Sequence, residues 1–292
     1  MFNALTGLSA DTGYGAGRGK TNLGVVKVPD ARLVALSALF RPKKVTPAEI
    51  VFRDVAAEAG SPGGGLDRSV LNAMREVDAL CQVVRAFADP ASDKAPAPTQ
   101  EIVDLALETI VADLELVERR LGRVQKEKST PREKELLERL HAHLESEKAL
   151  RDLALVPEEW ALFSGYRFLS HKPLLCVLNV DEAAAAAPPP GDVLACVQSR
   201  GLGLVVLSAR VEQDIAQMSG DDEKAFLSDL GLTEPARDRF VREAFALLDL
   251  VSFLTVGEDE CRAWPIRRGT NAKAAAGKIH SDIERGFIRA EI

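Results

Sequence analysis

The chain has 292 residues, of which 46% are hydrophobic, and a formal net charge of -7. That length is enough to bury a large core and to divide it among more than one domain. The acidic balance argues against wholesale wrapping by nucleic acid, although it leaves room for a local basic face. No apolar run is long enough to cross a bilayer, and residues 1–10 lack the basic start and apolar core of a secretory signal. The composition therefore predicts a cytoplasmic globular protein without a membrane partner.

The cysteines give no sign of a metal site or a disulfide framework. The four of them lie far apart and never form a Cys-x-x-Cys pair. They are Cys81, Cys176, Cys196 and Cys261. We expect reduced and mostly buried thiols without a role in a site.

Short apolar runs separated by helical stretches predict buried strands in both halves of the chain. The runs cover residues 24–28, 50–55, 80–87, 173–179 and 203–208. Alternating strands and helices are typical of an α/β protein with a doubly wound sheet. In such a sheet, ligand-binding residues gather where the strands end.

Between the two halves, a Pro- and Ala-rich linker at residues 89–99 leads into a helical pattern. Apolar residues then recur at alternating three- and four-residue steps, which predicts one seam of a coiled-coil helix. The seam consists of Leu107, Ile110, Leu114, Val117, Leu121 and Val124.

The chain is expected to reverse at residues 128–133 and to return as a second helix. Thr130 can cap this helix, Pro131 suits its first position, and Glu133 can complete a capping box. Its apolar positions are Leu137, Leu140, Leu144 and Leu150. The pattern predicts an antiparallel helical hairpin inserted into the α/β domain, and a simple solvated helix pair accounts for its charges equally well.

Near the C-terminus, a predicted helix at about residues 237–250 leads to a strand-like run at residues 251–256. The change in composition there indicates a new small domain. The residues from Cys261 onward carry too little apolar sequence to close that domain by themselves.

Several segments resemble one family of nucleotide-binding proteins. Residues 2–7 resemble the helix that follows the phosphate-binding loop of translation-factor-type GTPases, and residues 179–182 (Asn-Val-Asp-Glu) are similar to the NxxE base-recognition motif of the YchF family. Residues 207–212 resemble the loop that covers the base, and residues 275–291 resemble the signature of the family's TGS domain, a β-grasp fold. Further matches occur in order at residues 65–66, 75–80, 83–87 and 262–264. The chain is therefore identified as a member of the YchF/Obg-like family of P-loop ATPases and GTPases.

The resemblance implies a domain organisation. The G domain, a doubly wound P-loop NTPase fold, would have its first half at residues 1–97 and its second half at residues 159–250. A helical coiled-coil insertion would occupy residues 98–158, and a partial TGS domain would occupy residues 251–292. In the family, the inserted helices and the TGS domain frame a cleft proposed to meet ribosomal or other RNA.

The resemblance also implies a base site, formed by Asn179, Val180, Glu182, Ser208 and Ala209. Asn179 would hold the loop and contact the purine, and Glu182 would accept from groups on the base. Ser208 and the Ala209 backbone would lie beside the purine. Because most GTPases have Asp where this family has the longer Glu, the family is associated with ATP as well as GTP, and the choice between them stays open. The implied cofactor is Mg²⁺ together with ATP or GTP, if nucleotide is bound at all.

The chain departs from the family where phosphate should be bound. A phosphate-binding loop supplies backbone N–H groups, a Lys and a Ser or Thr hydroxyl for Mg²⁺, and no GxxxxGK(S/T) pattern occurs in the 292 residues. Residues 13–21 end in Gly-Lys-Thr, but their spacing is wrong and they align with the first switch loop. There Arg18 falls where the family has a magnesium-binding Thr, so Thr21 would serve only if the loop were rebuilt. We expect that the native product includes an upstream strand and loop.

The second switch is altered as well, because residues 54–57 (Asp-Val-Ala-Ala) stand where DxxG is expected. Asp54 keeps its place at a strand end and would hold Mg²⁺ through water, although a strand-end Asp often only caps a turn. Ala57 replaces a Gly whose backbone N–H normally meets the γ-phosphate, in a conformation that a β-carbon hinders.

Two functions follow from these observations. In the first, the chain is a YchF-type nucleotide-binding protein associated with the ribosome or translation, with activity impaired by the missing loop and the altered switches. In the second, it is a non-catalytic RNA- or protein-binding scaffold that uses the helical arm and the TGS region. The sequence assigns no catalytic residue, so whether the chain is an enzyme stays open.

Overall fold

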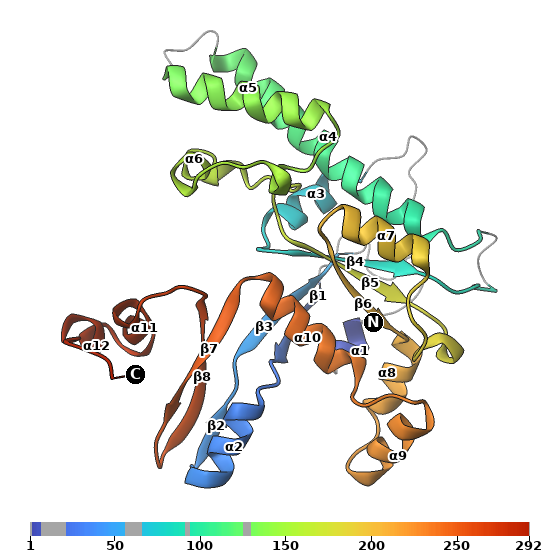
Figure 1. Cartoon of the computed structure of the whole chain (residues 1–292), viewed down its shortest axis with the longest axis vertical. Helices are drawn as coiled ribbons and strands as arrows, with labels where there is room; N and C mark the ends of the chain where they lie inside the picture. The colour runs from blue at the N-terminus through green and yellow to red at the C-terminus, as the bar shows by residue number, and fades with distance from the viewer. Residues whose placement is uncertain (1, 7–21, 56–65, 91–93, 125–129, 292) are drawn as a thin grey trace. The chain divides into compact units, whose positions relative to one another are not determined.

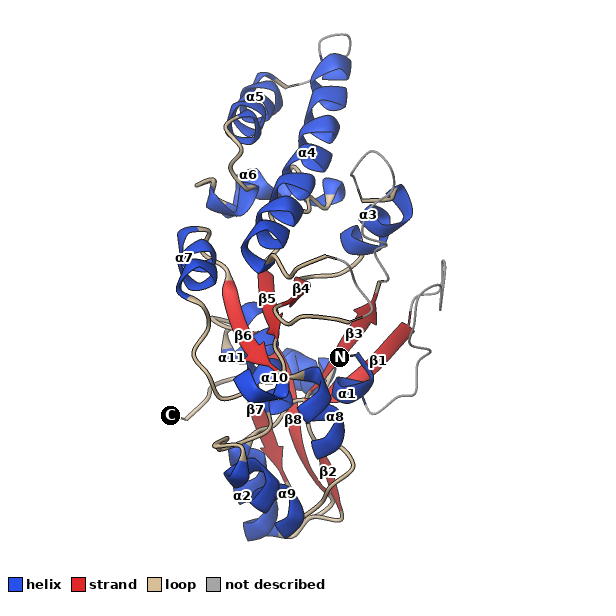
Figure 2. Ribbon diagram, turned by 90° about the vertical axis from the view of Figure 1, so that its right-hand side faces the viewer, coloured by secondary structure: helices blue, strands red, loops and turns tan. Residues whose placement is uncertain are grey.

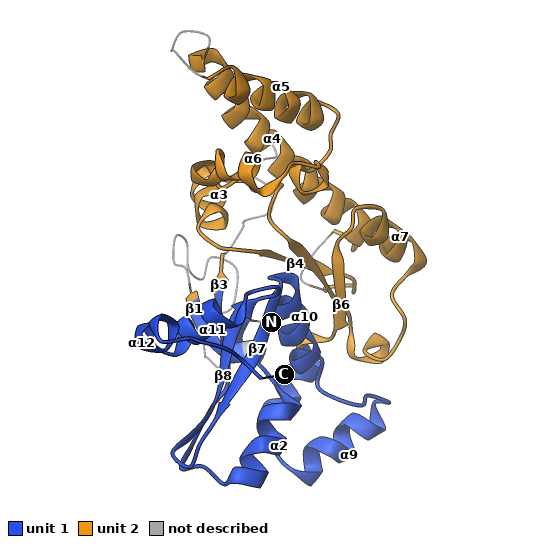
Figure 3. Ribbon diagram, turned by 60° about the vertical axis from the view of Figure 1, so that its left-hand side comes forward, with its two compact units in different colours: residues 1–9, 23–52, 210–292 blue, residues 10–22, 53–209 orange. Residues whose placement is uncertain are grey.

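A computed structural model of the chain describes residues 2–6, 22–55, 66–90, 94–124 and 130–291 (Figure 1). The chain divides into two compact units, which Figure 3 shows in different colours. Unit 1 contains residues 1–9, 23–52 and 210–292, and unit 2 contains residues 10–22 and 53–209. The predicted fold class, α/β with an inserted helical arm, is confirmed, whereas the division into four domains stays a prediction. None of the described helices is long and apolar enough to cross a bilayer.

Unit 1 is built mainly on two small sheets. Its helices are α1 (Phe2–Thr6), α2 (Ala31–Phe40), α8 (Ala209–Ile215), α9 (Asp221–Asp229), α10 (Ala236–Leu247), α11 (Ala272–Ile279) and α12 (Ser281–Arg285). Its strands are β1 (Asn22–Lys27), β2 (Lys44–Thr46), β3 (Glu49–Asp54), β7 (Leu250–Val256) and β8 (Glu260–Arg267). A few end residues of these elements are counted with unit 2, namely Asn22 of β1, residues 53–54 of β3 and Ala209 of α8. Strands β1 and β3 pair, and the other sheet has the order β2-β8-β7.

Helix α1 packs closely against β1. A β-carbon placed on Gly24 would lie only 2.2 Å from Cγ2 of Thr6. Any residue other than glycine would therefore force helix α1 or the Thr6 side chain to move. In the neighbouring strand β3, the ring of Phe52 packs against Phe240 of α10, with 5.3 Å between ring centroids. These contacts bury one face of the β1–β3 pair in unit 1.

The C-terminal strands of unit 1 form an antiparallel hairpin. Strand β7 pairs with β8 so that Phe253 lies opposite Trp264, and Nε1 of Trp264 donates to Oγ1 of Thr255 at 2.9 Å. The predicted strand at residues 251–256 is therefore present. Strand β8 also pairs in parallel with β2, which lies far earlier in the chain.

Unit 2 contains a parallel sheet and the helical arm (Figure 2). Its strands are β4 (Leu80–Arg85), β5 (Leu174–Asn179) and β6 (Gly203–Leu207), in the order β4-β5-β6. Its helices are α3 (Arg68–Arg75), α4 (Pro98–Val124), α5 (Pro131–Glu145), α6 (Pro157–Ala161) and α7 (Gly191–Ser199), with 3-10 turns η1 (Leu150–Asp152), η2 (Ser164–Tyr166) and η3 (Glu182–Ala184).

The central strand β5 is buried along nearly its whole length. Its residues Leu174 to Leu178 are all buried, which is the pattern expected of a parallel strand covered on both faces. Cys176 and Leu178 pack in one core cluster with Val193 and Val197 of α7. All four thiols are free, and three of them are buried as expected, whereas Cys81 is exposed.

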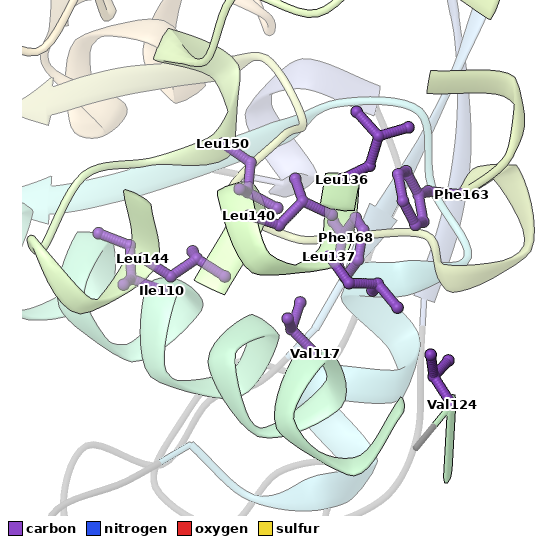
Figure 4. Packing of buried hydrophobic residues seen from close by; sticks show 10 residues of the cluster. All are labelled: Ile110, Val117, Val124, Leu136, Leu137, Leu140, Leu144, Leu150, Phe163 and Phe168. Atoms are coloured by element: carbon purple, nitrogen blue, oxygen red, sulfur yellow. The ribbon is translucent and has the colours of Figure 1, made fainter. Parts of the chain in front are cut away.

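The arm is a hairpin of α4 and α5 that buries most of the seams predicted from the sequence. Leu150, expected on the second helix, lies after α5 in η1, although it packs in the same cluster. Ile110, Val117 and Val124 of α4 pack in one cluster with the leucines of α5, as Figure 4 shows. Leu114 and Leu121 are partly buried against the same cluster, whereas Leu107 does not belong to it. These α5 residues are Leu136, Leu137, Leu140 and Leu144.

The start of α5 follows the prediction in part. Oγ1 of Thr130 accepts from the backbone N–H of Glu133 at 3.2 Å, and Pro131 occupies the first turn. The carboxylate of Glu133 does not complete the capping box. It accepts from Nε and Nη2 of Arg120 at 2.8 and 2.6 Å, which joins α5 to α4.

A buried carboxylate ties the arm to the segment that enters β5. Asp113 of α4 is fully buried, and it accepts from the backbone N–H groups of Leu169 and Ser170 at 2.9 and 2.7 Å. The hydroxyl of Ser170 donates to it at 2.8 Å, and Nη2 of Arg75 lies 3.7 Å away. Burial raises the pKa of Asp113, and the hydrogen bonds and Arg75 oppose that rise. The carboxylate therefore holds three parts of unit 2 together.

Replacing Asp113 tests this role. Asp113→Ala leaves two buried backbone N–H groups and one hydroxyl without an acceptor, so we expect a loss of about 3–5 kcal/mol in the free energy of unfolding. Urea denaturation measures the loss. Asp104→Ala, at an exposed position on the same helix, is the control and should change the free energy by no more than about 0.5 kcal/mol. Equal effects of the two variants would contradict the role.

Candidate functional site

The parallel sheet brings the ends of β5 and β6 together. Arg85, Asn179 and Leu207 lie in register across the three strands. The pairing continues past the strand ends, because Ala86 N–H donates to the Asn179 carbonyl and Val180 N–H donates to the Leu207 carbonyl, each at 2.9 Å. The segments that follow β5 and β6 therefore leave the sheet at the same edge, where ligands of such sheets bind.

Asn179 holds the loop after β6. Its Oδ1 accepts from the backbone N–H of Ala209 at 2.9 Å. With Oδ1 engaged in this way, the amide group Nδ2 has no partner among the described residues and can donate to a ligand. Asn179 thus contacts the neighbouring loop, and its contact with a purine stays a prediction.

Two other predicted residues contribute differently. The side chain of Val180 is only 7% exposed and packs into the core cluster beneath the sheet, so only its backbone is left for a ligand. Because its N–H already bonds Leu207, the remaining group is its carbonyl. Ser208 is only 3% exposed and lies directly before Ala209.

Glu182 presents a carboxylate on a short turn. It is the first residue of η3 and it is exposed, and its carboxylate has no hydrogen bond or ion pair to any residue that the structure describes. Asp181 shapes this turn, since its Oδ1 accepts from Ala184 N–H at 3.0 Å. Asp181 is not one of the residues predicted for the site, although an Asp before a run of Glu and Ala is a common N-cap signal.

The predicted magnesium residue lies at the end of β3. Nδ2 of Asn22 lies 3.5 Å from Oδ2 of Asp54, which is the limit of a hydrogen bond and leaves the carboxylate weakly held. Thr21, Arg18 and Ala57 lie outside the described residues. Within the described ranges, no group of three or more His, Cys, Asp and Glu side chains could hold a metal ion. One carboxylate fits Mg²⁺ bound mainly by water and phosphate, so Asp54 stays a predicted ligand.

Glu212, the last residue of the segment that resembles the base-covering loop, has a structural role. It is only 4% exposed, and its carboxylate accepts from the N–H groups of Ala236 and Arg237 at 2.8 and 2.9 Å. A carboxylate at the first turn of a helix satisfies N–H groups that have no partner within the helix. Burial raises the pKa of Glu212. Glu212 therefore caps α10 within unit 1.

The parallel sheet, the loops at its carboxyl edge and the inserted arm define the class of the protein, an α/β protein with the P-loop NTPase fold and a helical arm. Comparisons with known proteins narrow the class. Residues 250–292 match the family model YchF-GTPase_C, described as a protein of unknown function (DUF933). The "Ribosome-binding ATPase YchF" of Bacillus subtilis (strain 168) is 38% identical, over 100% of this chain and 84% of that protein.

Two further relatives carry the same family name. A protein of the same name from Escherichia coli O157:H7 is 36% identical over 100% of this chain and 84% of its own length. The solved structure of the Schizosaccharomyces pombe YchF GTPase superposes with a TM-score of 0.85 at 26% identity, covering 98% of this chain and 82% of that one. The chain belongs to the YchF family.

The contact between Asn179 and Ala209 can be tested without any ligand. Asn179→Ala removes the acceptor of Ala209 N–H, so we expect faster hydrogen exchange at Ala209 and a loss of about 1–3 kcal/mol in unfolding free energy. Glu182→Ala is the control, because Glu182 is exposed and unpaired among the described residues. Unchanged exchange at Ala209 in the Asn179 variant would contradict the arrangement.

Proposed function

We propose that the chain is a purine-nucleotide-binding protein of the YchF type that acts with the ribosome. The observation that carries the proposal is the hydrogen bond from Ala209 N–H to Oδ1 of Asn179, which joins the two loops at the carboxyl edge of the parallel sheet. Its relatives support the partners, since the Bacillus subtilis and Escherichia coli proteins are named ribosome-binding ATPases.

Each predicted site residue then has a distinct task. Nδ2 of Asn179 donates to an acceptor on the purine, and the exposed carboxylate of Glu182 accepts from an exocyclic amine or ring N–H. The Ser208–Ala209 backbone lies beside the base and limits where it sits. Adenine and guanine both carry an acceptor for Asn179, so these residues admit ATP and GTP. The preference for ATP or GTP then depends on which N–H groups of the base the Glu182 carboxylate can reach.

The proposed site offers fewer groups to the phosphates than to the base. Asp54 would hold Mg²⁺ through water, and Mg²⁺ when bound would neutralise charge on the phosphates. The 292 residues contain no GxxxxGK(S/T) loop, and Ala57 stands at the Gly position of DxxG. We therefore propose that this chain binds the base better than the phosphates and hydrolyses nucleotide poorly.

The ribosome contact is assigned to the helical arm and the C-terminal region. The arm buries its leucine seam and leaves charged side chains such as Glu118 and Arg119 exposed along α4. The TGS assignment of residues 251–292 is part of this proposal. Nucleotide-independent binding by these two regions is the alternative function, a non-catalytic scaffold for RNA or protein.

Calorimetric titration of the 292-residue chain with ATP and with GTP, each with Mg²⁺, tests the proposal. We expect weak, saturable binding that Asn179→Ala abolishes, because the base contacts supply most of the affinity. Glu182→Ala should change the ratio of the ATP and GTP affinities. Micromolar binding would show that the phosphates are well held and would overturn the proposed weakness.

Two further outcomes are informative. A chain extended at its N-terminus with a strand and GxxxxGK(S/T) loop of the family pattern should bind both nucleotides more tightly than the 292-residue chain. If neither chain bound nucleotide, the nucleotide function would be refuted and the scaffold function favoured.

A further inference from the structure

A groove of about 370 Å³ lies between α3 and α4 of unit 2. Apolar residues from both helices line it, among them Leu71 of α3 and Leu116 of α4, and Tyr166 of η2 closes one side. Tyr166 is held in place by its neighbours, because its ring stacks on Phe168 at 5.3 Å and meets Phe163 edge-on at 5.9 Å. The groove therefore has an apolar wall of fixed shape, and its volume lies within the range of small-molecule sites.

Three arginines line the same groove, Arg68 and Arg75 of α3 and Arg119 of α4. Arg75 is anchored, since its Nη2 donates to the Ala112 carbonyl at 3.3 Å and lies 3.7 Å from Oδ1 of Asp113. The buried carboxylate of Asp113 offsets the charge of Arg75.

The other two arginines have no direct ion-pair partner among the described residues. Arg68 and Arg119 are exposed, and neither forms an ion pair or side-chain hydrogen bond with a residue that the structure describes. Glu115 is the acidic residue in the lining. The two free guanidinium groups outweigh it, so the groove favours a negatively charged ligand.

We propose that this groove binds a small organic oxyanion, that is, a compact apolar or aromatic group that carries a phosphate or a carboxylate. Arginine presents paired N–H donors in a planar fork that matches both oxyanions. Arg68 and Arg119 bind the oxyanion, and Leu71, Leu116 and Tyr166 contact its apolar part. None of these residues belongs to the proposed nucleotide site, so the groove is a separate function of unit 2.

The occupied groove would join α3 to the arm. α3 ends at Arg75, which already contacts Ala112 of α4, and a ligand held by Arg68 and Arg119 adds a second link between the same two helices. We expect such a ligand to slow hydrogen exchange in α3 and in the middle of α4.

Phenyl phosphate is the probe, with inorganic phosphate and benzyl alcohol as probes that each lack one half of the ligand. Amide chemical shifts of the 292-residue chain report where each one binds. We expect phenyl phosphate to saturate shifts in α3 and α4 at millimolar concentrations, and to bind on the order of tenfold more tightly than either half. Benzoate in place of phenyl phosphate distinguishes a carboxylate ligand from a phosphate ligand.

The variant Arg68→Ala/Arg119→Ala should weaken phenyl phosphate at least about tenfold, because it removes both charged donors. Arg123→Ala removes an exposed arginine one turn further along α4 and outside the groove, and should leave binding unchanged. Asn179→Ala should also leave it unchanged, which keeps this test independent of nucleotide binding. A cooperative unfolding transition of each variant, under conditions where the Asn179 variant stays folded despite its lower stability, will show that the variants fold.

The proposal would be overturned if phenyl phosphate caused no saturable shifts in the wild-type chain, or if the double arginine variant bound it as tightly. It would also be overturned if benzyl alcohol bound as well as phenyl phosphate, since the guanidinium groups would then contribute nothing.

Discussion

The parallel pairing of β4, β5 and β6 is the constraint on which the candidate site depends. The register places Asn179 opposite Leu207, so that the backbone two residues further along reaches the Asn179 side chain. A slip of one residue would break the hydrogen bond from Ala209 N–H to Oδ1 of Asn179 and would draw the polar Asn179 toward the interior. The run from Leu174 to Leu178 is buried on both faces, so it opposes a slip that would put Asn179 in the place of one of these apolar residues. Apolar packing within the sheet thus positions a polar side chain at its edge.

A second constraint acts at the other end of β5. Asp113 accepts from Leu169 and Ser170 just before the strand begins, and it lies on the helix that also forms the arm. A buried carboxylate is costly unless hydrogen bonds compensate for the water it has lost, and this one has three donors and a nearby guanidinium. The start of β5 and the base of the arm are therefore one rigid assembly in unit 2. Movement of the arm would first displace the residues that lead into β5, the strand that ends in Asn179.

Much of this organisation follows from the sequence, and the reasons are local. Strands such as residues 174–179 can be predicted because they are continuous apolar runs. The arm can be predicted from the spacing of its leucines and from Thr130 and Pro131 at the turn. What the sequence does not reveal depends on contacts between distant segments. The pairing of β2 with β8 joins a three-residue strand to a segment near the C-terminus, and no local pattern encodes that pairing.

The polar contacts were the hardest to predict. Glu133 fits a capping box by spacing, yet Arg120 of the facing helix offers it a charged donor and takes the carboxylate. Asp113 lies between Ile110 and Val117 on the buried side of α4, and a lone acid in an apolar stripe is a usable signal for a buried network. The family motif identified Asn179 and Glu182, but only the structure shows that the Val180 side chain belongs to the core. The groove arginines come from two helices, so no linear motif contains them.

The most direct test of the account is hydrogen–deuterium exchange of the 292-residue chain with and without a saturating concentration of ATP and Mg²⁺. We expect slower exchange in the segments after β5 and β6, around residues 179–184 and 208–209, because the proposed site places the purine between them. Protection confined to other segments, or no protection under conditions where ATP binds, would contradict the assignment of this sheet edge as the nucleotide site.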